Sequence, residues 1–440
     1  MSTTELGPAF FLAVVVILVT CRVTALALRG LGQPPVVGEM VAGVLLGPSL
    51  LGLLAPGVQD ALFPQELRPV LFVAGQIGLV VFMFQAGYEL RTDRVRPVAG
   101  AAGVISVAGI VVPFALGAGL VWAVHGSVDI LPDGVSLLVA CLFVGVTLAI
   151  TAFPMLARII TERGLTGSRF GSISLAAGAL DDVVAWVLLA GVVSLSRDSA
   201  GPFAKAVAGA AGLVLMLALL LRAREPIARR LDRLAPERVV LLTVLTLFLA
   251  AWYTDKIGLY AVFGAFSLGT VFPRSAAVDH AVDAVAPVAR IVFLPLFFTY
   301  SGLNTDFGLL AGTAFLLLTA GCVLAAIAGK FGACWLAARA VGEEPGVALR
   351  IGTLMNARGL MQLIAINIGL TAGIVSPRLF SMLVVVALVT TLMATPLLSL
   401  WDLLDRRRGG AVPEGGAAPA GGPPPESVEK PAPAEPGMPA

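Results

Sequence analysis

Long apolar runs of about 20 residues, separated by short polar breaks, dominate the chain. A helix needs about 20 apolar residues to cross the hydrocarbon core of a bilayer, so each run predicts a transmembrane helix. The pattern predicts about thirteen of them, at 8–29, 34–54, 69–89, 99–124, 134–159, 168–196, 201–223, 238–255, 258–273, 284–303, 309–340, 347–372 and 376–402. The predicted fold class is therefore an all-α polytopic membrane protein.

Composition supports this fold class. Of the 440 residues, 13% are charged and 58% are hydrophobic, whereas a soluble domain carries about twice that charged fraction. The four cysteines lie inside apolar runs without the spacing of metal ligands, which predicts core positions. The sequence contains no phosphate loop, nucleophile elbow or metal-ligand cluster. We therefore expect a transporter rather than an enzyme, with no cofactor and no nucleic-acid partner.

Arginine-rich loops alternate with loops that are poor in basic residues, and the 125–133 loop has none. Basic residues collect on the cytoplasmic side of a membrane. With thirteen crossings, all the rich loops fall on one side, so we expect the N-terminus outside and the C-terminus in the cytoplasm of the cell (inner or plasma) membrane. These basic positions are Arg91, Arg94, Arg96, Arg158, Arg163, Arg169, Arg222, Arg224, Arg229, Arg230, Arg233, Arg406, Arg407 and Arg408.

The last segment of the chain is almost entirely Pro, Gly and Ala with a few charges. Such a composition cannot bury a core. We therefore expect a disordered cytoplasmic tail at 406–440, and no nucleotide-binding or other regulatory domain after the membrane part.

Two short patterns occur twice. Ala42–Gly47 resembles Gly264–Gly269, and Gly87–Asp93 resembles Gly302–Asp306. The offset is seven predicted helices, so corresponding helices run in opposite directions. This predicts inverted repeats of six helices, as in many secondary transporters.

Helix-breaking residues occur at the fifth helix of each half. The run 134–159 contains Thr147, Thr151 and Pro154, and the run 347–372 contains Asn356-Ala357-Arg358-Gly359. Proline removes a backbone donor, and buried polar residues can satisfy the freed groups. We expect two broken helices that cross near the midplane and offer carbonyls and helix ends to a cation. The alternative is a proline kink together with an arginine buried for packing.

Two adjacent aspartates, Asp181 and Asp182, lie in the middle of the apolar run Phe170–Leu195. A carboxylate at the centre of a membrane helix costs roughly 2.5–3.5 kcal/mol on insertion scales, and such residues mark ion or proton pathways. An intramembrane aspartyl protease would need two carboxylates that face each other. Neighbouring helix residues point about 100° apart, which argues against that alternative.

Lys330 is the lysine that lies deep in an apolar run. Counted from the same side, it is roughly 12–15 Å deep and Asp182 roughly 18 Å at the helical rise, so contact is possible. One aspartate can pair with Lys330 while the other faces a cavity and holds either a proton or a small cation. The alternative, a salt bridge that only fixes helix packing, leaves the second aspartate unexplained.

Several stretches together resemble the monovalent cation:proton antiporter superfamily in its Kef-like branch, over about residues 8–402. They are Gln33–Glu39 through Gly47–Ser49, Thr151–Pro154 with Leu156–Arg158, Ala179–Asp182, Leu294–Phe298, Gly329–Phe331 and Met355–Met361. The aspartate pair is similar to that of electrogenic sodium/proton antiporters. In those, the second aspartate is the main ion ligand, and the first can pair with a lysine at the position that Lys330 matches. Many relatives have Glu where this chain has Gln362, so a carboxylate role there is absent.

The resemblance implies a homodimer in the lipid bilayer that works as an elevator. It implies a scaffold and dimer domain at 1–95 and 237–307, a moving core at 96–198 and 308–405, and a linker helix at 199–236.

These observations predict an antiporter that exchanges Na⁺ or Li⁺ for protons. Asp182 would alternate between cation and proton, and Asp181 with Lys330 would form a proton-sensitive pair. Thr151, Asn356 and backbone carbonyls would complete the site, and Arg358 would compensate charge. Potassium/proton exchange on the same scaffold and a sodium-coupled solute symporter remain the alternatives.

Overall fold

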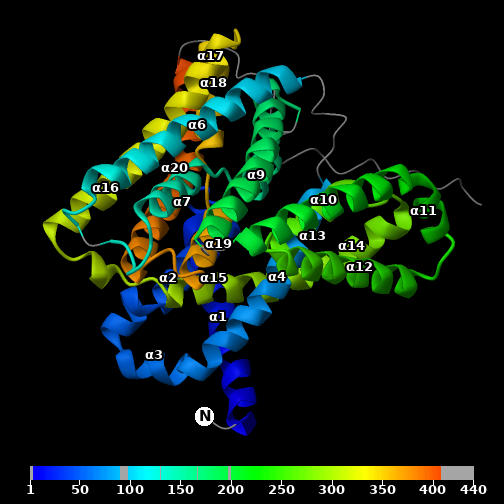
Figure 1. The fold of residues 1–440 in the computed structure, drawn as a ribbon, viewed down its shortest axis with the longest axis horizontal. Helices are drawn as coiled ribbons and strands as arrows, with labels where there is room; N and C mark the ends of the chain where they lie inside the picture. The colour runs from blue at the N-terminus through cyan, green and yellow to red at the C-terminus, as the bar shows by residue number, and fades with distance from the viewer. Residues whose placement is uncertain (1–2, 90–97, 129, 166, 197–199, 408–440) are drawn as a thin grey trace, which may run out of the picture.

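The structure, a computed structural model, describes residues 3–89, 98–128, 130–165, 167–196 and 200–407. These residues form helices and connecting segments without a strand (Figure 1). The α-helices are α1 (Thr3–Arg29), α2 (Pro35–Leu46), α3 (Pro56–Leu62), α4 (Arg68–Glu89), α6 (Ala99–Val124), α7 (Leu137–Ala149), α8 (Phe153–Glu162), α9 (Arg169–Leu195), α10 (Ala200–Arg222), α11 (Arg224–Leu231), α12 (Pro236–Lys256), α13 (Ala261–Val271), α14 (Ala276–Val288), α15 (Leu294–Leu303), α16 (Thr313–Ile327), α17 (Ala333–Ala340), α18 (Pro345–Met355), α19 (Leu360–Thr371) and α20 (Pro377–Arg407).

Each of the thirteen predicted runs coincides with a helix or with two helices in succession. In the described part of the chain, ten spans are long and apolar enough to cross a membrane, and α13 and part of α10 are shorter apolar helices. The all-α polytopic fold is thus confirmed, and the number of crossings stays a prediction.

The two predicted helix breaks are present. The first lies at 150–152, between α7 and α8, where the backbone of Ile150 is extended. The second lies at 356–359, between α18 and α19, where Gly359 has a φ of 63° that favours glycine. The amide of Ala152 donates to the carbonyl of Ala357 at 3.1 Å. The breaks therefore cross at one point, as the sequence predicted.

The repeated glycine patterns contact each other crosswise. Gly47, in the first pattern, lies against Gly302, and its inverted counterpart Gly269 lies against Gly87. A Cβ on any of the four would overlap the facing backbone. The same close approach thus joins α2 to α15 and α13 to α4, as expected of two inverted copies.

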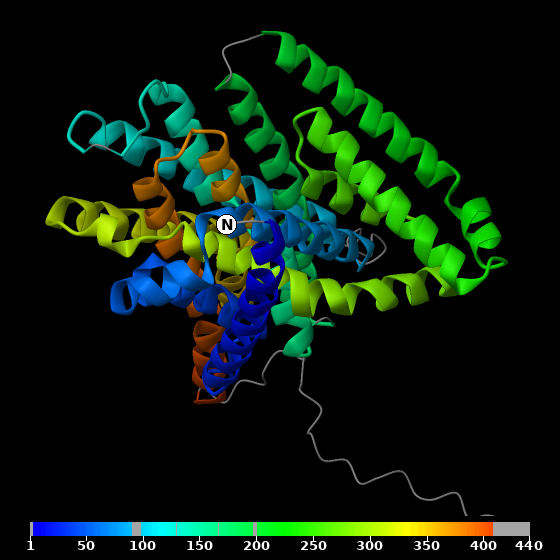
Figure 2. The ribbon, with the colours of Figure 1, turned by 90° about the horizontal axis from the view of Figure 1, so that it is seen from below.

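Two sets of helices pack mainly among themselves. One set contains α1, α2, α4 and α12–α15, and the other contains α6–α9 and α16–α20. Helix α10 contacts both α9 of the second set and α12 and α13 of the first. Figures 1 and 2 show α10, α11 and α12 on one side, away from the broken helices.

Parts of two sequence predictions fall outside the described residues. The arginine-rich loop with Arg91, Arg94 and Arg96 lies within the undescribed stretch 90–97. The predicted disordered tail also lies outside, except for Arg406 and Arg407, which end α20.

The glycine contacts predict a stability difference. Gly302→Ala should force α2 and α15 apart and lower the stability by about 1–3 kcal/mol, the usual cost of overpacking. Gly103→Ala is the matched control, because a Cβ on Gly103 meets no atom within 4 Å. Thermal unfolding of both variants in detergent checks this. Equal unfolding midpoints for the two variants would contradict the proposed close contact.

Candidate functional site

Asp181, on α9, is completely buried, and both of its carboxylate oxygens accept hydrogen bonds. Its Oδ1 accepts from the Ser106 hydroxyl at 2.5 Å. Its Oδ2 accepts from Lys330 Nζ at 2.6 Å and from the Thr151 hydroxyl at 2.8 Å. Asp181 is therefore the aspartate that pairs with the buried lysine.

Lys330 is equally buried and uses all of its donors. An ammonium group has three N–H bonds. They are directed to Asp181, to the carbonyl of Gly109 on α6 and to the carbonyl of Ala149 at the end of α7, the last two at 2.7 and 2.6 Å. The lysine lies in a π-helical turn, Ala328–Gly332, and such turns re-aim single side chains and are frequent at functional sites. The charge pair thus joins three helices to this turn.

Asp182 is also completely buried, but neither of its oxygens has a hydrogen-bond partner among the described residues. The backbone amide of Phe153, in the first turn of α8, lies near its carboxylate without meeting hydrogen-bond geometry. A buried carboxylate without a partner is costly when ionised. A proton or a bound cation removes that cost, so the carboxylate can serve as a binding group for either.

The broken helices place opposite partial charges on the two sides of the site. The C-terminal end of a helix is partially negative and the N-terminal end partially positive. Lys330 and Arg358 donate to carbonyls in the last turn of α7, those of Ala149 and Thr147. Asp182 lies near the first turn of α8. These three buried charges, Lys330, Arg358 and Asp182, therefore each lie beside a helix end of opposite sign.

Arg358, between α18 and α19, is completely buried and forms no ion pair with any carboxylate of the described residues. It donates to the carbonyls of Thr147 and Ala326, at 3.2 and 3.1 Å. Ala326 is near the end of α16, just before the π-helical turn that interrupts the regular bonding pattern. Arg358 therefore balances carbonyl ends of helices rather than an acidic side chain.

The two predicted polar ligands differ in their surroundings. Thr151 lies at the first break and donates to Asp181, with the carbonyl of Met355 also within reach at 3.3 Å. Asn356 lies at the second break, where its amide nitrogen is 3.5 Å from Met393 Sδ and its Oδ1 has no partner among the described residues. The structure thus brings Thr151 into the aspartate network and leaves one free acceptor on Asn356.

Sequence reasoning missed three groups of the network: the Ser106 hydroxyl and the carbonyls of Gly109 and Ala149. Ser106 is a small polar residue in a long apolar helix, which is a weak signal on its own. The absence of a side chain on Gly109 makes room for Cys334, because a Cβ there would lie only 2.7 Å from Cys334 Sγ, whereas its distance of 3.5 Å from Lys330 Nζ would be an ordinary contact.

A second charged network, also missed, attaches the first half of the second broken helix, α18, to α20. Arg350 on α18 is buried and contacts Asp402 and Asp405 at the end of α20, each at 2.8 Å. Arg163, after α8, donates to the hydroxyl of Ser399 on α20 at 2.8 Å. The end of α8 and the middle of α18 are thereby both attached to α20.

A multi-pass helical protein whose buried carboxylate has no partner among the described residues and lies beside two crossing broken helices has the architecture of an ion-coupled secondary transporter. The family model described as "Sodium/hydrogen exchanger, transmembrane" matches residues 13–401. The chain is 36% identical over 389 residues to the Na⁺/H⁺ antiporter NhaS4 of Synechocystis, covering 87% of this chain and 95% of that protein. The chain therefore belongs to the sodium/hydrogen exchanger family.

Two further likenesses extend the comparison. The chain is 31% identical over 408 residues to the K⁺/H⁺ antiporter 1 of Saccharomyces cerevisiae, covering 89% of this chain and 46% of that protein, so it spans about half of the yeast protein. The solved structure of the sodium proton antiporter MjNhaP1 of Methanocaldococcus jannaschii superposes with a TM-score of 0.64 at 16% identity, covering 92% and 98% of the two chains. The likeness to the MjNhaP1 structure shows that the chain has the same fold.

Because Lys330 and Asp181 compensate each other's buried charge, the stability effects of substituting the two residues should be strongly coupled. Lys330→Met should lower the stability by about 3–5 kcal/mol, because it leaves Asp181 buried and uncompensated. Adding Asp181→Asn should restore much of that loss. Lys256→Met, at an exposed position at the end of α12, is the control and should change stability by at most about 0.5 kcal/mol. Thermal unfolding of the single and double variants measures the coupling, which would be absent if the double variant were no more stable than Lys330→Met.

Proposed function

We propose that this protein exchanges a monovalent cation, Na⁺ or Li⁺, for protons, with Asp182 as the alternating binding group. One observation carries the proposal. Of two adjacent, completely buried carboxylates, Asp181 accepts three hydrogen bonds, whereas Asp182 accepts none from the residues that the structure describes. Asp182 is therefore the group that lacks, and can accept, a small positively charged ligand.

Coupling follows from the cost of burying an uncompensated charge. An empty, ionised Asp182 in a site closed to both sides would carry an effective penalty of several kcal/mol. The carboxylate is neutralised when it holds a proton and compensated when it holds a cation. Only the proton-bound and the cation-bound forms of Asp182 move readily from one side of the membrane to the other. Each passage of a cation in one direction is therefore followed by the return of protons.

The remaining cation ligands are oxygens at the helix breaks. Carboxylate and carbonyl oxygens suit hard cations. The carbonyl of Ala149 already accepts from Lys330, and the carbonyl of Thr147 accepts from Arg358. The carbonyl of Met355 lies within reach of the Thr151 hydroxyl. We infer that Asn356 Oδ1, neighbouring free carbonyls and Thr151 supply the other ligands, while Arg358 holds the break in shape.

The Asp181–Lys330 pair is the second proton-sensitive element in this proposal. Protonation of Asp181, or loss of the Lys330 proton, would release the bond between α9 and the π-helical turn. A pair that changes its protonation during the cycle would allow more than one proton for each cation.

The two helix sets support an elevator mechanism. We infer that α1–α4 and α12–α15 form the scaffold and dimer domain, at 1–95 and 237–307. The second set would be the moving core, at 96–198 and 308–405, and α10 within 199–236 would link the two. In this proposal the protein is a homodimer in the cell membrane, with the N-terminus outside and the C-terminus inside, and it acts as a transporter rather than an enzyme.

Potassium is the second candidate cation. The yeast relative is named a K⁺/H⁺ antiporter, and the oxygens that would select between the two ions are largely backbone groups. A proteoliposome assay that compares Na⁺, Li⁺ and K⁺ separates the two candidates.

The proposal predicts that Asp182→Asn abolishes exchange without unfolding the protein. In sealed proteoliposomes with an acidic lumen and a pH-sensitive dye, external Na⁺ or Li⁺ should alkalinise the lumen of wild-type vesicles, and choline should not. Asp283→Asn, at an exposed carboxylate on α14, is the control and should behave as the wild type. A response to K⁺ alone would move the protein to the potassium candidate, and wild-type rates in Asp182→Asn would refute the site.

Lys330→Gln should change the pH dependence or the number of protons per cation more than it changes the cation affinity. The reason is that Lys330 contacts Asp181 and two carbonyls but not Asp182. Reversal potentials measured at several pH values give the stoichiometry, with Lys256→Gln as the control. Unchanged coupling and pH dependence would argue against a role for Lys330 in proton transfer.

A further inference from the structure

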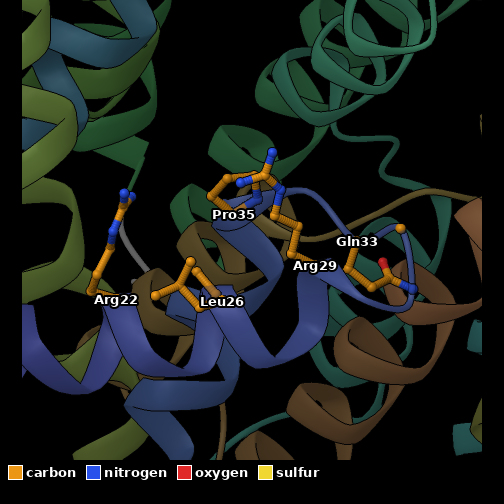
Figure 3. A pocket seen from close by; sticks show the side chains of 7 residues that line it. Arg22, Leu26, Arg29, Gln33 and Pro35 are labelled. Atoms are coloured by element: carbon orange, nitrogen blue, oxygen red, sulfur yellow. The ribbon is translucent and has the colours of Figure 1, made fainter.

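We propose that a pocket between the end of α1 and the start of α2 binds the phosphate headgroup of an anionic phospholipid from the surrounding bilayer. The cavity has a volume of about 370 Å³. Figure 3 shows the two arginines that extend into it from α1. It is lined by Arg22, Ala25, Leu26, Arg29, Gly32, Gln33 and Pro35. This inference does not depend on the exchange activity.

Two guanidinium groups give the pocket its charge. Arg22 and Arg29 are seven residues apart on α1, so they lie on the same side of the helix, roughly 10 Å apart along its axis. Figure 3 shows both extending from one side of α1, with Leu26 between them. Both are exposed, and neither forms an ion pair with a carboxylate in the part of the chain that the structure describes. Guanidinium groups bind phosphate with paired N–H bonds.

A buried acceptor at the same pocket is also unused. Gln33 is only 6% exposed, and its amide nitrogen donates to the carbonyl of Leu392 on α20 at 2.7 Å. That bond orients the side chain, and its Oε1 has no partner among the described residues. A buried acceptor needs a donor. The hydroxyl groups of a glycerol headgroup would supply one beside the phosphate, so the pocket offers ligands for both parts of the headgroup.

The surface below the pocket fits acyl chains. Arg22 lies within the apolar span of α1 rather than at its end, where a charged side chain requires a partner or must reach the interface. The stripe that continues along α1 from Leu26 is apolar and exposed, through Val23, Val19 and Val15. Basic pockets between membrane helices are known binding sites for anionic headgroups. A lipid with its phosphate at the arginines would place its chains along this stripe.

The pocket lies where α1 and α2 pack closely together, which favours a defined binding site over nonspecific electrostatic attraction. Gly38 of α2 packs directly on the backbone of Ala25, where a Cβ would overlap α1. Gln33 attaches the turn between these helices to α20 of the other helix set. A bound headgroup would therefore stabilise the contact between the two sets.

The test uses the full chain, purified in detergent and freed of lipid. Phosphatidylglycerol, phosphatidylcholine, inorganic phosphate and glycerol phosphate are each added, and binding is followed by native mass spectrometry and by the thermal unfolding midpoint. We expect phosphatidylglycerol alone to bind and to raise the midpoint. In the double variant Arg22→Gln/Arg29→Gln, its binding should weaken about 30-fold, from the usual contribution of a basic residue near an anionic lipid surface taken twice.

Two controls separate a specific pocket from general charge. Arg229→Gln/Arg233→Gln removes the same charge from exposed positions on and after α11 and should bind as the wild type does. Arg22→Lys/Arg29→Lys keeps the charge and should keep most of the binding. An unchanged lipid affinity in Arg22→Gln/Arg29→Gln would overturn the proposal. Equal binding of glycerol phosphate or inorganic phosphate would overturn the proposal and indicate a soluble anion as the ligand. If native mass spectrometry showed that Arg22→Gln/Arg29→Gln loses dimers but keeps its bound lipid, the occupant would be a second copy of the chain, which would also overturn the proposal.

Discussion

The buried ion pair between Asp181 and Lys330 is the interaction on which the rest of the site depends. Removing two such charges from water costs several kcal/mol for each ion, and their attraction offsets this only when the remaining hydrogen bonds are made. Here Ser106 and Thr151 donate to the two oxygens of the aspartate, and two carbonyls accept the remaining N–H bonds of the lysine. The pair therefore fixes α9 against α6, the end of α7 and the π-helical turn. It also determines which helix ends remain free to contact an ion.

That saturation explains why two adjacent aspartates have different surroundings. Neighbouring positions on a helix point about 100° apart, so a rigid network around Asp181 cannot also satisfy Asp182. The second carboxylate is left near the positive end of α8 with no donor among the described residues. The free-energy cost of an empty, ionised Asp182 is thus a consequence of the hydrogen bonds that hold Asp181 in place. In the proposed mechanism this cost couples the two transported ions, since it disfavours passage of the unloaded form.

Much of this arrangement could be predicted from the sequence because it depends on depth and spacing along the chain. The apolar runs placed Asp182 and Lys330 at compatible depths, the helix breakers located both breaks, and the repeated glycine patterns indicated two inverted copies. Which of the two aspartates pairs with Lys330 was left open by the sequence. The partners of Arg358 could not be predicted, because they are carbonyls on other helices and any residue type provides a carbonyl. The same applies to Gly109 and Ala149 as acceptors for Lys330. Only packing in three dimensions shows which backbone groups are free.

Those occupied carbonyls bear on ion selectivity. Lys330 and Arg358 take acceptors at the end of α7 that a bare helix terminus would offer to a cation. The remaining candidates, Asn356 Oδ1 and the free carbonyls of the two breaks, are held by the crossing bond between Ala152 and Ala357. In the proposed mechanism, the spacing of these oxygens, rather than the number of charges, would decide which ion fits. In this proposal, a small shift at the crossing would change the spacing and leave the charged network in place, which is compatible with the likeness of this chain to relatives named for Na⁺ and for K⁺.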